Sequence, residues 1–292
     1  TQMIVLGCRS LLWSRKSANL IDMGTHSSCL TAGIDIGSLT ADAVIMDGIK
    51  LLSHAILPTG ANSETAARRS YEEALASAGL RESEISSVGA TGYGRTSVPF
   101  ASRVVTEITC HAVGARWRFP EAKTVIDIGG QDSKVIRMGD DGRVEDFAMN
   151  DKCAAGTGRF LEVMAKSLET RIDLLAELAR GSLADVRINS TCTVFAESEV
   201  VALVAGGTPK EDIIRGLHNS VADRIYGMVR RLRGAAPFVM TGGVAKNAGI
   251  VEALAARFRA EVLVPEEPQI IGAIGAAVMA ADGERRSVSS ER

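Results

Sequence analysis

Short apolar segments that end in a glycine turn recur along the chain. The tetrapeptide Ile-Asp-Ile-Gly occurs at residues 34–37 and again at residues 126–129. Each copy is followed by a second apolar segment, at residues 43–46 and 135–138, and then by an Asp-Gly pair. Because apolar segments separated by glycine turns are typical of hairpins, each copy predicts an antiparallel meander of strands.

Helical patterns follow both predicted meanders, at Glu64–Ala78 and at Gly158–Leu168. A third apolar segment, residues 238–241, leads into Gly242-Gly243, and a helix is expected from about Asn247 to Arg259. A helix N-terminus behind a double glycine suits the ribose and α-phosphate of a nucleotide. Repeated meanders alternating with helices predict an α/β fold of two related halves with a cleft between them.

The expected domain organisation follows from these blocks. Residues 1–31 contain only a short apolar core interrupted by basic residues, so we expect a disordered extension and not a signal peptide. Residues 32–122 form the first predicted half, to which a helix at residues 275–292 returns. Residues 123–274 form the second predicted half.

Composition and charge exclude several classes of function. With 33 basic and 35 acidic residues the net charge is −2, so no overall field attracts nucleic acid or an anionic membrane. Aromatic residues make up only 4% of the chain, which disfavours a surface for base stacking. The five cysteines do not form a secreted disulfide pattern, so we predict a cytoplasmic protein without nucleic-acid or membrane partners.

Asp35 and Asp127 occupy matching places beside the two repeated glycine turns. A glycine turn lets backbone N–H groups approach a phosphate, and a neighbouring carboxylate can hold Mg²⁺ or its waters. A single copy is better explained by turn capping, but two matching copies favour phosphate binding. We therefore predict Asp35 and Asp127 as catalytic and magnesium-binding residues, with Gln131 as a candidate to orient the attacking water.

The order of the glycine motifs resembles that of the actin, Hsp70 and sugar-kinase ATPase fold. The motifs are Gly33–Thr40, Ile126–Asp132, Thr241–Gly243 and Gly272–Gly275, the last of which opens a helix of small residues. This resemblance covers residue 32 to about residue 281 and implies ATP bound between two ribonuclease-H-like halves. The chain contains no G-x-x-x-x-G-K-[ST] phosphate loop.

Two cysteines stand just before helical patterns, and we expect each of them to open a helix. Cys153 stands in Asn150–Phe160, and Cys192 stands in Ser190–Glu199. The N-terminus of a helix favours the thiolate form of a cysteine, which suits a metal–sulfur centre. A [4Fe–4S] cluster ordinarily takes four thiolates, and an identical subunit could supply the missing pair. From spacing alone, however, two single cysteines are more often buried structural residues than cluster ligands.

These two stretches, together with the phosphate motifs, closely resemble the activators of 2-hydroxyacyl-CoA dehydratases, in the BadF/BadG/BcrA/BcrD ATPase family. The resemblance implies a homodimer with ATP, Mg²⁺ and one bridging [4Fe–4S] cluster, with Cys153 and Cys192 as ligands. It also implies ATP-dependent transfer of an electron from ferredoxin or flavodoxin to a dehydratase. By position it places the following residues around Mg²⁺ and the phosphates: Asp35, Gly37, Ser38, Leu39, Thr40, Asp127, Gly129, Gly130 and Gln131.

Three alternative functions remain compatible with the sequence. The nearest is an ATPase subunit of a benzoyl-CoA reductase, which the identity of the partner would distinguish. A small-molecule kinase of the same fold would need a base for a bound hydroxyl group and no iron. A nucleotide sensor would bind ATP without turnover.

Overall fold

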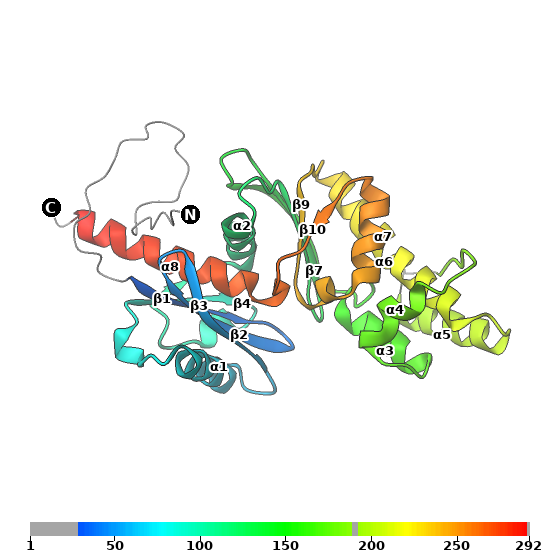
Figure 1. Ribbon diagram of the computed structural model, residues 1–292, viewed down its shortest axis with the longest axis horizontal. Coiled ribbons are helices and arrows are strands. Elements are labelled where there is room, and N and C mark those ends of the chain that lie inside the picture. The colour runs from blue at the N-terminus through cyan, green and yellow to red at the C-terminus, as the bar shows by residue number, and fades with distance from the viewer. Residues whose placement is uncertain (1–28, 189–191, 291–292) are drawn as a thin grey trace, which may run out of the picture. The chain divides into compact units, whose positions relative to one another are not determined.

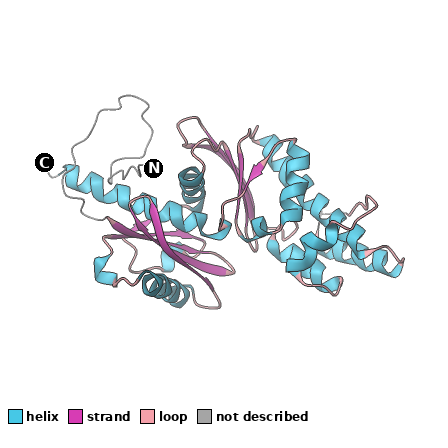
Figure 2. Ribbon diagram, viewed as in Figure 1, coloured by secondary structure: helices cyan, strands magenta, loops and turns pink. Residues whose placement is uncertain are grey.

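The computed structural model describes residues 29–188 and 192–290 as two compact units, drawn in Figures 1 and 2. The first unit runs to Trp117 and resumes at Ile270, and the second is Arg118–Gln269. The boundaries predicted from the sequence lie a few residues later, at 122/123 and 274/275. The predicted disordered extension falls on residues that, up to residue 28, lie outside the described range.

The first unit is built on a five-stranded sheet in the order β3-β2-β1-β4-β5. Its strands are β1 (Leu30–Ile36), β2 (Thr40–Asp47), β3 (Lys50–Pro58), β4 (Ser87–Gly92) and β5 (Arg103–Val104). Its helices are α1 (Ser63–Ala78), α2 (Glu107–Arg118) and α8 (Ile271–Ser290). The first three strands pair antiparallel, as the meander predicts, whereas β4 and β5 add in parallel.

Helices cover both faces of the first sheet. α1 packs on β2 and β3, while α8 packs on β1 and β4 from the opposite face (Figure 1). Ile34 and Ile36 of β1 are fully buried and form one apolar core with Tyr71 of α1. The alternation of side chains along a strand sends every second residue of β1 toward α8 instead. The small residues of α8 therefore pack directly on the sheet, as the sequence predicts.

The second unit repeats this arrangement, with the strand order β10-β9-β6-β7-β8. Its strands are β6 (Thr124–Ile128), β7 (Ser133–Met138), β8 (Val144–Asn150), β9 (Phe238–Thr241) and β10 (Val262–Leu263). Its helices are α3 (Gly158–Ser167), α4 (Leu175–Ala179), α5 (Thr193–Ala205), α6 (Lys210–Arg231) and α7 (Ala248–Phe258). The order and the directions of pairing match those of the first unit. The predicted α/β fold of two related halves is thereby confirmed.

The second core joins the sheet to its helices. Ile126, Ile128 and Val135 pack in one buried cluster with apolar residues of α3, α6 and α7. This core fixes the position of the glycine turn after β6 relative to the helices of its own unit. Among the described helices, none is both long enough and apolar enough to cross a membrane.

Candidate functional site

The two Ile-Asp-Ile-Gly copies form the same tight hairpin in their respective units. The N–H of Gly37 donates to the carbonyl of Thr40 at 2.9 Å, and the N–H of Gly129 donates to the carbonyl of Asp132 at 3.0 Å. The side chain of Gln131 is exposed at the tip of the second loop. In the first loop, Ser38 and Leu39 are likewise exposed at the tip. Both loops therefore have exposed tips next to glycine backbone, which is the backbone that a phosphate-binding turn requires.

Each loop is held in place by another segment of its own unit. In the first unit, Thr59 donates its N–H to the carbonyl of Leu39 and its hydroxyl to the carbonyl of Gly37, both at 2.9 Å. In the second unit, the first two N–H groups of α3 donate to the carbonyls of Gly129 and Gly130, at 2.9 and 2.8 Å. The first loop is thus tied to the end of β3 and the second to the start of a helix.

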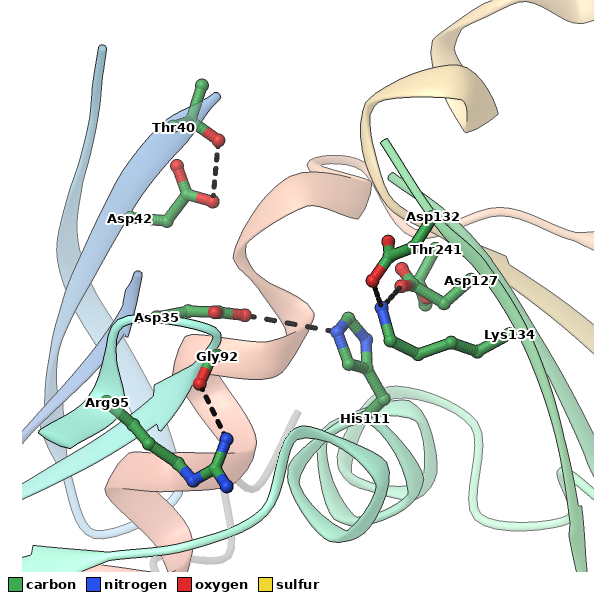
Figure 3. Close-up of polar contacts among 10 residues, drawn as sticks. All are labelled: Asp35, Thr40, Asp42, Gly92, Arg95, His111, Asp127, Asp132, Lys134 and Thr241. Carbon is green, nitrogen blue, oxygen red and sulfur yellow. Dashed lines mark hydrogen bonds and ion pairs between the residues drawn. The ribbon is translucent and has the colours of Figure 1, made fainter. Parts of the chain in front are cut away.

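Asp35 lies near the end of β1 with its carboxylate buried between two glycines, Gly92 and Gly272. A Cβ atom added at either glycine would overlap a carboxylate oxygen of Asp35. The imidazole Nε2 of His111 lies 3.9 Å from Asp35 Oδ2, as Figure 3 shows. A carboxylate is the kind of oxygen ligand that Mg²⁺ takes, and the two glycines lie against it without side chains of their own. The site at Asp35 therefore fits a magnesium ligand.

Asp127 occupies the matching place in the second unit but has different partners. Thr241 donates its hydroxyl to Asp127 Oδ1 at 2.9 Å, and Lys134 Nζ lies 3.2 Å from Oδ2 (Figure 3). The same ammonium lies 2.8 Å from Asp132 Oδ2, and Lys134 is only 3% exposed. Because both carboxylate oxygens already accept a hydrogen bond, the surroundings fit contact with Mg²⁺ through water better than direct coordination. Magnesium binding by Asp127 stays a prediction.

The double glycine forms a turn against the second loop. Gly242 has φ +83°, and a Cβ atom there would lie 2.8 Å from Asp127 Oδ1. Gly243 begins a short 3₁₀ turn that leads to Asn247, whose side chain caps α7 by accepting the N–H of Ile250 at 3.3 Å. The helix expected after the double glycine is confirmed, and it begins in the same unit as Asp127.

The two candidate cluster cysteines stand in different local settings. Cys192 is the N-cap residue of α5, as the sequence predicts, whereas Ser190 and Thr191 of its motif lie outside the described residues. Cys153 does not open a helix, and this expectation was wrong. Thr157 is the N-cap of α3, and Gly156, with φ +87°, holds the intervening chain in a turn.

The turn after Cys153 is closed by hydrogen bonds within it. The amide of Asn150 donates to the carbonyls of Cys153 and Ala155, at 2.8 and 3.3 Å. The hydroxyl of Thr157 donates to the carbonyl of Ala154 at 2.7 Å. These bonds fix the backbone that holds the Cys153 thiol. Within residues 29–188 and 192–290, no three His, Cys, Asp or Glu side chains gather as a metal site.

Comparison with known proteins identifies the family. The model of the BadF/BadG/BcrA/BcrD ATPase family matches residues 32–280, which include both hairpin loops, the double glycine and both cysteines. The chain belongs to this family. The resemblance inferred from the motifs is thereby confirmed, and the BadF/BadG/BcrA/BcrD match covers both structural units.

Individual relatives in the family are similar over nearly their whole length. An activator of lactoyl-CoA dehydratase from Anaerotignum propionicum is 46% identical over 88% of this chain and 99% of its own. A solved structure of the activator of the 2-hydroxyisocaproyl-CoA dehydratase from Clostridium difficile, with bound ADPNP, has a TM-score of 0.84. It is 43% identical and covers 89% of this chain and 97% of that one.

The fold extends to more distant ATP-dependent enzymes. A ROK family glucokinase from Streptomyces griseus has a TM-score of 0.53 over 87% of this chain and all of its own, at 18% identity. At that identity only the fold is shared. The expected sugar-kinase type of fold for this BadF/BadG/BcrA/BcrD family member is confirmed.

Three further residues lie around the two aspartates in this family member: Lys134 and His111, which were not predicted, and Thr241, which was predicted only as part of the double-glycine motif. Lys134 stands opposite Asp127 in the register of β6 and β7, at the position where Asp42 stands opposite Asp35 in the other unit. A lysine inside an apolar strand directly after a phosphate turn is a sequence signal that could have indicated it. The contact of Thr241 with Asp127 and that of His111 with Asp35 have no comparable local signal.

A buried histidine lies beneath the start of α7. His218 of α6 is 2% exposed, and its Nε2 lies 3.4 Å from the Asn247 side-chain amide. Gly249 leaves the room that the imidazole ring fills. Burial lowers the pKa of His218 from 6.5 to about 4, because a charged imidazolium would lose its hydration. The folded protein therefore keeps this side chain neutral.

This depressed pKa predicts a pH-dependent stability. Between pH about 4 and 6.5 the unfolded chain binds a proton at His218 that the folded chain does not, so stability rises with pH in that window. Well above pH 6.5 His218 is neutral in the folded and the unfolded chain, so it no longer changes the free energy of unfolding. At pH 5 this residue should make the free energy of unfolding about 2 kcal/mol lower than at pH 7.5. Denaturant unfolding at pH 5 and pH 7.5 measures it. The His218→Gln variant should lack this part of the pH dependence, and equal slopes in the two proteins would contradict the assignment.

Proposed function

We propose that this chain is an ATP-dependent electron-transfer activator of a 2-hydroxyacyl-CoA dehydratase. It would form a homodimer around one [4Fe–4S] cluster and pass an electron from ferredoxin or flavodoxin to the dehydratase. The observation that supports this best is the direct bonding of the second phosphate loop to α3, the helix that follows the Cys153 turn. The proposed nucleotide loop and the proposed cluster ligand are thus neighbours in one unit.

The hydrolytic step is assigned to the two aspartates and Gln131. Asp35 would bind Mg²⁺, whose charge offsets that of the β- and γ-phosphates of ATP. Asp127 accepts a hydrogen bond at each oxygen, which holds its carboxylate in a fixed orientation, so we assign it to orienting the water together with Gln131. The attack of water on the γ-phosphorus breaks the bond to the bridging oxygen and releases ADP and phosphate.

The nucleotide itself would contact the three glycine turns. The N–H groups around Gly37–Thr40 and Gly129–Gln131 suit the phosphates, because the glycines in these loops let a phosphate approach the backbone closely. The turn at Gly242-Gly243, which leads into α7, suits the ribose and α-phosphate. These assignments apply to the loops within each unit.

The cluster would be held by Cys153 and Cys192 from each of two subunits. Two thiolates per chain are half of the usual ligand set, so a second copy completes it. When bound, the cluster supplies one-electron transfer. The start of α5 supports a subunit contact beside Cys192, because Val194 and Phe195 are 65% and 67% exposed.

Iron and sulfide counts after anaerobic purification test this proposal. About four irons per two chains are expected, and both Cys153→Ala and Cys192→Ala should lose them. Cys29→Ser, at a half-exposed cysteine of the first unit, is the matched control and should keep its iron. A colourless monomer that hydrolyses or transfers phosphate without iron, even after reconstitution, would refute the proposal and favour a kinase.

A further inference from the structure

The first turn of α3 is capped by the second phosphate loop. Gly158 and Arg159 are the first two residues of this helix, and the N–H groups at that position have no acceptor within a helix. Here they donate to the carbonyls of Gly129 and Gly130, at 2.9 and 2.8 Å. The loop thus supplies the acceptors that α3 needs, and α3 fixes two consecutive peptide groups of the loop.

Fixing the carbonyls also fixes the direction of the next N–H groups. In a trans peptide the N–H points away from the carbonyl of the preceding residue. Since the carbonyls of Gly129 and Gly130 point to α3, the N–H groups of Gly130 and Gln131 point away from it. Two successive N–H groups on one side of a turn are the donor arrangement that binds an anion. The orientation of the proposed phosphate donors therefore depends on α3.

The same helix start is continuous with the Cys153 turn. Only Ala154–Thr157 separate Cys153 from Gly158, and this short segment is closed internally. Thr157 donates its hydroxyl to the carbonyl of Ala154 at 2.7 Å and its N–H to the same carbonyl at 3.1 Å. Because these hydrogen bonds hold the turn together, a displacement of Gly158 also moves Cys153; no flexible linker separates the two residues.

We infer that the N–H groups of Gly158 and Arg159 position the 129–131 loop and transmit the state of the nucleotide to Cys153. This inference rests on the proposed function. A γ-phosphate on the N–H groups of Gly130 and Gln131 strengthens the bonds that the same peptides make to α3, because hydrogen bonds in a chain polarise one another. After hydrolysis and release of phosphate that support is lost, so the Cys153 turn differs between the two nucleotide states.

The Gly158→Pro variant tests this contact. Proline is well accepted at the first position of a helix, and Thr157 already has the extended backbone (φ −125°, ψ 173°) that a following proline requires. The substitution removes the N–H that binds Gly129 and places a ring carbon against that carbonyl. Gly158→Ala is the matched control, because it keeps the N–H and brings its Cβ atom to 3.2 Å from the same oxygen.

The readout is the rate at which a chelator removes iron from the anaerobic, iron-loaded dimer, with ADP and with a non-hydrolysable ATP analogue. The wild type and Gly158→Ala should show at least about a fivefold difference between the two nucleotides. Gly158→Pro should keep its iron, and at saturating concentrations of either nucleotide the ratio of its two rates should be close to one. A wild-type ratio in Gly158→Pro, or a ratio near one in the wild type, would overturn the inference.

Hydrogen exchange of the wild type gives a second measurement that does not depend on the proline variant folding. The amides of Gly158 and Arg159 should exchange at least about tenfold more slowly with the ATP analogue than with ADP, while amides at the end of α3 should not differ. Equal protection in both states would overturn the inference. A protein that binds nucleotide and shows this difference, but holds no iron, would refute the proposed function and leave no electron-transfer centre for the contact to control.

Discussion

Lys134→Met is expected to lower the free energy of unfolding by about 3–5 kcal/mol and to abolish ATP hydrolysis. The ammonium of Lys134 is 3% exposed and lies between Asp127 and Asp132, at 3.2 and 2.8 Å. Removing it leaves the buried carboxylate of Asp127 without its opposite charge, which costs far more than the pair itself contributes. Denaturant unfolding and steady-state ATP hydrolysis measure the two effects.

Lys123→Met is the matched control for this prediction. Lys123 also pairs with an aspartate at 3.2 Å, but the side chains of Lys123 and Asp140 are 45% and 92% exposed. Solvent screens that pair, so its loss should change stability by no more than about 1 kcal/mol. The double variant Lys134→Met/Asp127→Asn should recover part of the lost stability, because the unpaired charge is gone. Equal effects of Lys134→Met and Lys123→Met would contradict the role of burial.

Gly272→Ala is expected to reduce ATP hydrolysis about 100-fold while leaving the fold in place. Its Cβ atom would overlap Asp35 Oδ2 and lie 3.1 Å from His111 Nε2. The carboxylate cannot move toward Gly92, because that residue lies against its other oxygen. Asp35 must therefore rotate out of its place. Steady-state hydrolysis across a range of Mg²⁺ concentrations, with thermal unfolding in parallel, checks this result.

Gly275→Ala, one turn further along α8, provides the contrast. Its Cβ atom would overlap the backbone carbonyl of Cys110 in α2, which cannot rotate away as a side chain can. This variant should lose stability, by about 1–3 kcal/mol or more, because the two helices must separate. If Gly272→Ala is destabilised as much as Gly275→Ala and keeps its activity per folded molecule, the role given to Asp35 is wrong.

Local patterns predicted the architecture well because they reflect local hydrogen bonding. The repeated Ile-Asp-Ile-Gly segments predicted two similar hairpins, and the structure has the same strand order in both units. The helix patterns at Glu64–Ala78 and Gly158–Leu168 match α1 and α3 to within one residue. Alternating side chains and turn glycines are short-range features, so the sequence alone contains them.

The position of Cys153 relative to α3 was predicted wrongly, and the neighbouring sequence contains only part of the reason. A glycine in Ala154–Thr157 is visible in the sequence, but its positive φ and the amide bonds from Asn150 are not. Those bonds let the chain form a closed turn before α3 instead of entering the helix at the cysteine. Cys192 has no such turn and caps α5 as expected.

The sequence by itself determined the two α/β halves, the glycine loops with Asp35 and Asp127 beside them, and the family to which the chain belongs. Only the tertiary structure decided what surrounds the two carboxylates. Thr241 reaches Asp127 across 114 positions of the chain, and His111 of helix α2 reaches Asp35 on strand β1. Strand alternation and turn chemistry act between near neighbours, whereas these contacts exist only because packed sheets and helices bring distant segments together.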